Sequence, residues 1–189
     1  NELASPQRNP GGVLVPQTEK GLTGKGFEFL AEMERMHMIV DVSHLSDKGF
    51  WDIVEHGTRP FAASHSNCRA LAPHTRNLTD EMIRALSERG GIAGLNYYAP
   101  FLDTDPTHPE NCRSTVELIA KHAAHYKQVG GAQMIALGSD FDGIDGPHQL
   151  ENAAFLPLLA DALRKEGFTE DEVEGIYYRN AMRFFEENL

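Results

Sequence analysis

Residues 38–66 read MIVDVSHLSDKGFWDIVEHGTRPFAASHS and set the pattern of the chain. The run 38–43 is apolar and β-branched, as in a buried strand. Ser46 and Asp47 are candidate N-caps of a helix that Gly57 closes. Residues 60–64 are the next strand candidate. The stretch therefore predicts a strand–helix–strand unit.

The same alternation continues outward from this unit. Strands are predicted over 91–97 and 134–138, and helices over about 26–36, 78–90, 114–128, 150–165 and 169–187. The strands are apolar throughout, as expected when both faces of a parallel sheet are buried. Four such βα units suit a small doubly wound sheet or half of a (β/α)8 TIM-type barrel, since a whole barrel takes about 250 residues. No glycine-rich phosphate fingerprint follows any predicted strand, which argues against a doubly wound sheet that binds a dinucleotide.

Composition excludes several classes of protein. The 189 residues carry a formal net charge of −11 without a basic block, which argues against a nucleic-acid partner. Two cysteines, Cys68 and Cys112, imply no disulfide framework. No apolar run approaches the roughly 20 residues that span a bilayer.

The first segment, 1–25, is rich in proline and glycine and is predicted to be an active-site loop that follows a missing strand. Its start resembles neither an initiator methionine nor a signal peptide, so the chain is interpreted as part of a longer protein. Localisation stays open, with the cytoplasm slightly favoured because no signal peptide is visible.

Three predicted strands end in polar residues that apolar packing would not select. The first runs into His44, the second into His65, and the fourth into Asp140 and Asp142. The carboxyl ends of parallel strands form one reactive edge, so these side chains should converge. Imidazole and carboxylate are ligands that suit zinc. The alternatives are hydrogen-bonded structural histidines and aspartates that cap the turn before Gly143.

Other candidates for chemistry are weaker. His122 and His125 lack the HExxH spacing and are interpreted as a solvated helix face. The remaining histidines near turns and helix ends, His74 among them, are assigned to the surface. Arg76 follows the second strand on the same rim as His44 and His65. It is either a surface arginine or a fork that binds a substrate carboxylate.

At these residues the chain resembles the membrane (renal) dipeptidase family of binuclear zinc peptidases. Order and spacing agree from about residue 26 to the end, with His44 and His65 separated by 21 residues. The matching pieces are Asp41-Val42-Ser43-His44, Ser64-His65-Ser66, Arg76-Asn77, Leu95-Asn96-Tyr97-Tyr98, Gly138-Ser139-Asp140-Phe141-Asp142-Gly143 and Arg179-Asn180-Ala181-Met182-Arg183-Phe184-Phe185.

The resemblance implies a (β/α)8 barrel, usually a homodimer, that hydrolyses dipeptides through a hydroxide bridging two zinc ions. It implies that His44 and His65 ligate one zinc, that Arg76 holds the free carboxylate of the substrate, and that Tyr98 lines the substrate pocket. Asp140 corresponds to the residue thought to carry a proton to the leaving amine.

The resemblance implies that the family's first half supplies the remaining ligands, a His-x-Asp motif for the other zinc and a Glu that bridges both metals, and also a His thought to stabilise the tetrahedral intermediate. None is in this chain, so residues 26–189 are expected to be the C-terminal half of the barrel. The partner is then the missing N-terminal half, in the same polypeptide or a second one. Two rival functions are another metal-dependent amidohydrolase on the same barrel and a non-catalytic barrel fragment.

Overall fold

The computed structural model describes residues 3–4, 20–104, 108 and 111–189. Most of the predicted loop 1–25 lies outside these residues. The larger helices are α1 (Gly24–Arg35), α2 (Asp47–His56), α3 (Asp80–Glu88), α5 (Val116–Gly130), α6 (Leu156–Lys165) and α8 (Asn180–Asn188). Shorter elements are α4 (Ala99–Leu102), α7 (Glu170–Glu174), the 3-10 turns η2 (Ala132–Met134) and η3 (Ala153–Phe155), and the π-helical turn η4 (Gly175–Arg179).

The strands β1 (Ala62–Ala63), β2 (Ile92–Leu95) and β3 (Ile135–Leu137) form a parallel sheet in the order β1-β2-β3. Ala63 pairs with Ala93, and Ala93 with Ile135. The predicted strand 38–43 is reduced to a single parallel bridge between Asp41 and Ala62, supported by hydrogen bonds on either side. The strand prediction was therefore wrong in extent, although the segment lies beside β1. Neighbours in the sheet follow chain order, and the fold is α/β.

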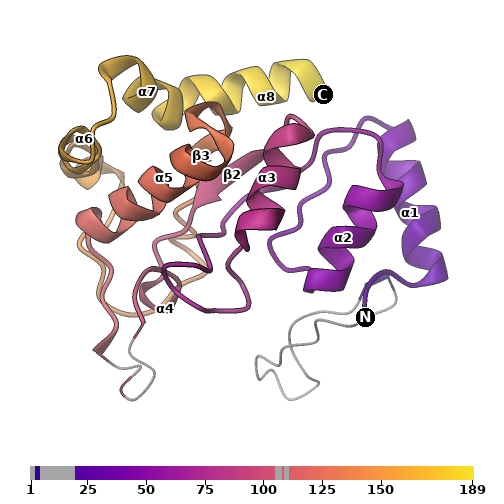
Figure 1. The fold of residues 1–189 in the computed structure, drawn as a ribbon, viewed down its shortest axis with the longest axis horizontal. Coiled ribbons are helices and arrows are strands. Elements are labelled where there is room, and N and C mark those ends of the chain that lie inside the picture. Colours follow the sequence, from indigo (N-terminus) through magenta and orange to yellow (C-terminus); the bar gives the residue numbers. More distant parts are fainter. Residues whose placement is uncertain (1–2, 5–19, 105–107, 109–110) are drawn as a thin grey trace.

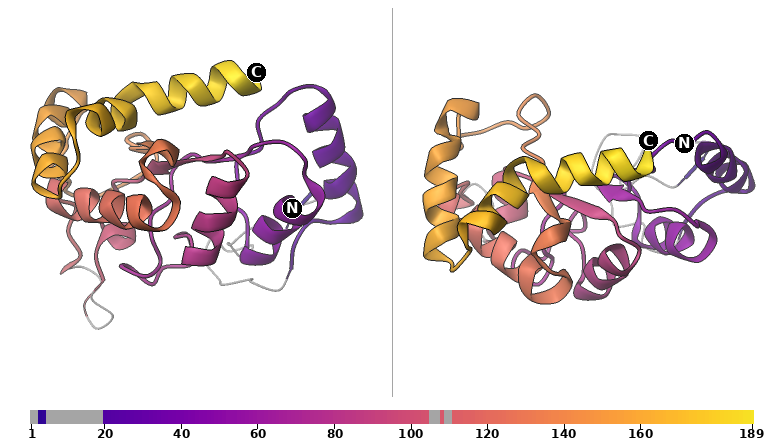
Figure 2. Two further views of the ribbon diagram at one scale, coloured as in Figure 1. Left: turned by 45° about the horizontal axis from the view of Figure 1, so that its top comes forward. Right: turned by 90° about the horizontal axis from the view of Figure 1, so that it is seen from above.

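Helices cover the sheet on two sides (Figures 1 and 2). Ala63, Ala93 and Ile135 are fully buried in the main core, which they share with side chains of α3 and α5. On the other side α8 runs across the strands, as Figure 2 shows. Phe184 of α8 packs there on a second cluster with one residue from each parallel segment: Ile39, Ala62, Ile92 and Ala136. Alternate residues of each strand thus face α3 and α5 or α8.

The helix boundaries follow capping residues. Thr23, Ser46, Thr79 and Thr115 each accept a backbone N–H at the start of α1, α2, α3 and α5. Thr169 and Glu172 form a capping box at the start of α7. The predicted helix 169–187 contains the π-helical turn η4 between α7 and α8. In the described part of the chain, no helix is long and apolar enough to cross a membrane.

His122 corrects one prediction. It is 1% exposed rather than solvated, because its Nδ1 accepts the backbone N–H of Cys68 and its Nε2 lies 3.1 Å from the carbonyl oxygen of Leu102. Burial lowers its pKa to about 4. His122 therefore fastens α5 to the loop at Cys68 and to the end of α4 as a neutral side chain. Cys68 and Cys112 are both free thiols.

Gly94 of β2 packs against the backbone of Ser64, which follows β1, and only glycine fits there. A Cβ on Gly94 would lie well under 3.0 Å from the carbonyl oxygen of Ser64 and also within 3.0 Å of Gly138. We expect Gly94→Ala to lower the free energy of unfolding by about 3 kcal/mol, at the upper end of overpacking costs. Urea unfolding measures this effect. Gly24→Ala is the control, because nothing lies within 4 Å of the added methyl group; an equal loss in both variants would contradict the argument.

Candidate metal centre and substrate rim

The structure brings His44 and His65 together. His44 lies in the turn after the 38–43 segment, and His65 follows β1 directly. Their Nε2 atoms are 2.9 Å apart and their ring centroids 4.9 Å apart. Two Nε2 ligands of one tetrahedral zinc lie about 3.3 Å apart, given Zn–N bonds of about 2.0–2.1 Å. The two rings therefore point at one place, where their Nε2 atoms lie at hydrogen-bond distance, and a shared metal ion would need them about 0.4 Å farther apart.

Both imidazoles are held in the neutral form. Burial and the Arg76 guanidinium lower the pKa of His44 to about 4. The same two causes, in the same order, lower the pKa of His65. Only a neutral imidazole has a lone pair for a metal ion, so both rings are ready to ligate near neutral pH.

The described residues supply two ligand atoms to this point. No third His, Cys, Asp or Glu among them forms a ligand group with His44 and His65; the one such group of three is Asp52, Glu55 and His56 on α2. There, Asp52 is already paired with Lys48, and Glu55 and His56 are exposed. The donor set of His44 and His65 fits zinc in kind but falls short of the three protein ligands that are usual for catalytic zinc.

Asp140 lies on the same edge, within electrostatic reach of both histidines. Its backbone is left-handed, with φ +61°, a conformation that Asp tolerates better than most residues. Its Oδ2 accepts a hydrogen bond of 3.2 Å from Asn96 Nδ2. A Cβ at position 143 would collide with Asp140 Oδ1, so Gly143 leaves room for the carboxylate in this position. The chain thus accepts an uncommon backbone conformation in placing this carboxylate.

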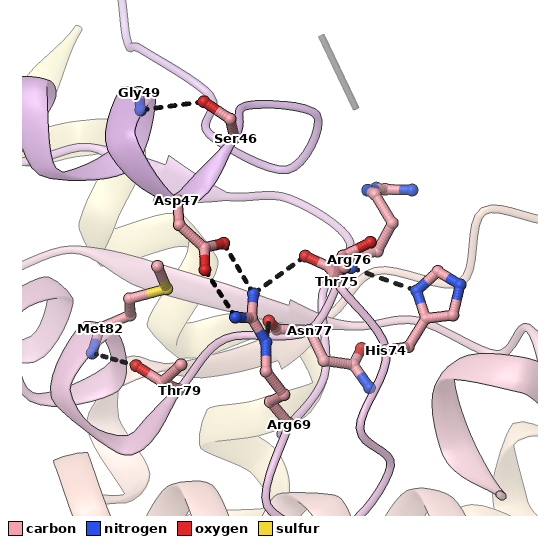
Figure 3. Close-up of polar contacts among 10 residues, drawn as sticks. All are labelled: Ser46, Asp47, Gly49, Arg69, His74, Thr75, Arg76, Asn77, Thr79 and Met82. Atoms are coloured by element: carbon pink, nitrogen blue, oxygen red, sulfur yellow. Dashed lines mark hydrogen bonds and ion pairs between the residues drawn. The ribbon is translucent and has the colours of Figure 1, made fainter. Parts of the chain in front are cut away.

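The loop that carries Arg76 is braced by Arg69 (Figure 3). Arg69 pairs with both carboxylate oxygens of Asp47, at 2.7 and 2.8 Å, at the start of α2. It also donates to the backbone carbonyls of Thr75 and Asn77. Figure 3 shows the Arg76 side chain extending away from Arg69, on the side of the loop where His74 lies. The brace therefore fixes the backbone from which Arg76 projects.

Arg76 itself is buried, with 5% exposure, so the surface alternative for this residue was wrong. Its Nε donates to the carbonyl oxygen of Ser43 at 2.5 Å, next to His44. Its guanidinium lies over the Phe101 ring, with Cζ 5.1 Å from the ring centroid. Tyr98 and His74 contact the same ring, at centroid distances of 5.0 and 4.6 Å. Phe101 thus joins Tyr98 to Arg76.

Sequence reasoning missed three buried asparagines that hold this rim. Asn67 donates to the carbonyl of Asn96 and accepts the Asn96 N–H. Asn67 and Asn77 both donate to the carbonyl of Phe101. His74 was also missed; it accepts the N–H of Arg76, and burial lowers its pKa to about 4. Asn77 and Asn96 lie inside quoted motifs, which was the signal available.

Comparison with known proteins decides the family. The model of the membrane dipeptidases, peptidase family M19, matches residues 1–188. The chain belongs to this family. Among its curated relatives, an uncharacterized protein of Klebsiella pneumoniae, from the pqqA 5′ region, is 38% identical over 89% of this chain and 61% of its own length. A dipeptidase of Claviceps purpurea is 33% identical over 88% of this chain and 38% of its own length.

Solved structures of two metallopeptidases, one of them of family M19, agree with the fold. A metallopeptidase of Rhodobacter sphaeroides, liganded with a phosphinate mimic of the dipeptide L-Ala-D-Ala, superposes with a TM-score of 0.83 at 32% identity. The match covers 92% of this chain and 49% of that one. The dipeptidase AC gives a TM-score of 0.81 at 33% identity over the same shares. The chain therefore spans about half the length of these two proteins.

Proposed function

We propose that this chain is the C-terminal half of the (β/α)8 barrel of a zinc-dependent dipeptidase. The observation that carries the proposal is the convergence of His44 and His65 Nε2 atoms, 2.9 Å apart, beside Asp140 and Arg76. Sequential parallel neighbours in the sheet and coverage of 49% of two solved metallopeptidase structures support the half-barrel. A doubly wound sheet would reverse its strand order at a switch point, and none occurs in the described residues.

The ligand count indicates what must be added. His44 and His65 would hold one of two zinc ions, and the remaining ligands would come from the N-terminal half of the barrel, in the same polypeptide or another. When bound, zinc supplies Lewis acidity and makes water a nucleophile near neutral pH. We refer below to this chain together with that half as the complete enzyme. We also propose that the complete enzyme forms a homodimer, as its resemblance to the family implies.

The protein's own groups divide the remaining work. Asp140 carries a proton to the departing amine, because its carboxylate lies at the same edge as both histidines and Asn96 orients it. Arg76 receives the free carboxylate of the dipeptide, with its Nε anchored on Ser43 and its face on Phe101. Tyr98 lines the pocket beside Phe101. A dipeptide fits because only a short substrate brings a free carboxylate this close to the scissile bond.

The relatives point to the same substrate class. The Rhodobacter sphaeroides structure holds a mimic of L-Ala-D-Ala, and the Claviceps purpurea relative is named a dipeptidase. We therefore propose dipeptides, including those with a D-residue at the C-terminal position, as substrates of the complete enzyme.

Arg76→Met tests substrate class and function together. We expect kcat/KM for a dipeptide to fall about 100-fold or more, the scale of losing a buried charge-assisted pair, while the slow hydrolysis of the same dipeptide amide is unchanged. The measurement is steady-state kinetics of the complete enzyme on both substrates. Arg84→Met, an exposed residue of α3, is the matched control.

Each rival function predicts another result. Equal losses on the dipeptide and its amide would favour a different amidohydrolase. Absence of hydrolysis and of bound zinc in the complete enzyme would favour a non-catalytic module. Family-like rates from this chain alone, freed of any other polypeptide, would show that no missing half is needed.

A further inference from the structure

A chain of hydrogen bonds leads from Asp41 to the candidate metal ligand His65. Asp41 Oδ2 is 2.5 Å from Ser64 Oγ, and Ser64 Oγ is 2.7 Å from His65 Nδ1. Asp41 Oδ1 meanwhile accepts the backbone N–H groups of Ser43 and Ser64, at 3.1 and 3.0 Å. Asp41 comes from the segment beside β1, so the chain of bonds crosses from one parallel segment to the next.

The chemistry of these groups fixes the direction of every proton. An ionised carboxylate only accepts hydrogen bonds, so the single hydroxyl proton of Ser64 must go to Asp41. Ser64 Oγ can then only accept from His65, which places a proton on Nδ1. In a neutral imidazole the other nitrogen, Nε2, is left with its lone pair. That Nε2 is the atom that faces His44.

We propose that Asp41 is a positioning residue that acts through Ser64 to hold His65 in the Nδ1–H tautomer, with Nε2 directed at the metal ion. The inference rests on the proposed role of His65 as a ligand. It gives the DVSH motif a second function besides supplying His44: its aspartate prepares the histidine of the following strand. Metal-ligating histidines commonly donate their other ring N–H to such a partner, and losing the partner costs about 10–100-fold in metal affinity.

The surrounding contacts keep this chain of hydrogen bonds from Asp41 through Ser64 to His65, called the relay below, in place. Ser43 Oγ accepts the backbone N–H of His65 at 3.0 Å, so the residue before one histidine holds the backbone of the other. Because two backbone N–H groups converge on Asp41 Oδ1, the carboxylate cannot rotate without losing both bonds. Backbone hydrogen bonds thus fix both ends of the relay, Asp41 and His65. Ser64 lies between them, and the direction of its hydroxyl proton decides which His65 nitrogen is protonated.

Asp41→Asn reverses the relay with almost no change of shape. The two backbone N–H groups require the amide oxygen at the Oδ1 position, which puts the NH₂ group against Ser64. Ser64 then accepts from this NH₂ group and donates its own proton to His65 Nδ1, which at 2.7 Å is a closer acceptor than Ser43 Oγ at 3.4 Å. The expected result is the Nε2–H tautomer, in which the ligand atom carries a proton.

The first measurement is the ¹⁵N chemical shifts of the His65 ring in the metal-free complete enzyme at pH 8. We expect a protonated Nδ1 in the parent protein and a protonated Nε2 in Asp41→Asn. The second is zinc affinity by chelator competition, expected to fall about 10–100-fold in Asp41→Asn. Ser64→Ala, which deletes the relay without reversing it, should lose less affinity than Asp41→Asn. Ser66→Ala is the matched control, since its buried Oγ has no hydrogen-bond partner among the described residues.

The outcomes separate this inference from the function it rests on. An unchanged Nδ1–H signal in Asp41→Asn overturns the relay, as does a larger affinity loss in Ser64→Ala than in Asp41→Asn, the order expected if these side chains only support the loop. If Asp41→Asn reverses the tautomer but His65→Ala leaves the zinc affinity unchanged, the relay is upheld and the assignment of His65 as a metal ligand is contradicted.

Discussion

His65→Ala should remove one zinc ion from each complete active site and lower kcat/KM by at least about 10³-fold. The loss of a partner behind a ligand already costs about 10–100-fold, and here the ligand itself is lost together with the zinc-activated water. His44 would remain as the single ligand that this chain gives to that ion. Elemental analysis of the purified enzyme and steady-state kinetics measure the two effects.

His56→Ala is the control for this prediction. His56 belongs to the other group of possible ligands in the described residues, with Asp52 and Glu55, but it is exposed and Asp52 is paired with Lys48. We expect unchanged metal content and activity. If His56→Ala loses the metal and His65→Ala retains it, the metal centre lies on α2 and not at His44 and His65.

The second large effect concerns the proton carrier. Asp140→Asn should lower kcat about 10²–10⁴-fold, the usual contribution of a general acid, with little change in KM or zinc content. Asparagine has nearly the same shape and tolerates φ of +61°, so the turn should keep its conformation. It can accept the Asn96 hydrogen bond but cannot carry the proton.

Asp142→Asn separates chemistry from turn structure. Asp142 lies two residues away in the same motif and is exposed. Its variant should keep kcat within about threefold, as for a surface change of less than about 0.6 kcal/mol. Equal losses in the two variants would assign the effect to the turn rather than to the Asp140 carboxylate.

The parts of the site at strand ends could be predicted from the sequence. His44, His65 and Asp140 each follow a short apolar run, and parallel strands bring their carboxyl ends to one edge. The environment of each side chain could not be predicted in this way. Arg76 is buried by Phe101 and Ser43, which lie 25 and 33 residues away in the chain. His122 is buried by Cys68 and Leu102 for the same kind of reason.

The lengths of the strands and helices were a second feature that could not be predicted from the sequence. The 38–43 segment has strand composition, but in the described residues its only ladder partner is β1, and a single bridge forms there. The π-helical turn η4 interrupts a run that has helical periodicity throughout. Both differences arise from tertiary contacts, since local pattern does not say which neighbours an element has.

The most direct test of the paired histidines is an anomalous diffraction map, collected at the zinc absorption edge on crystals of the complete enzyme. We expect a peak bonded to the Nε2 atoms of both His44 and His65, at about 2.0–2.1 Å from each. A map whose zinc peaks lie away from either of these atoms would contradict this assignment.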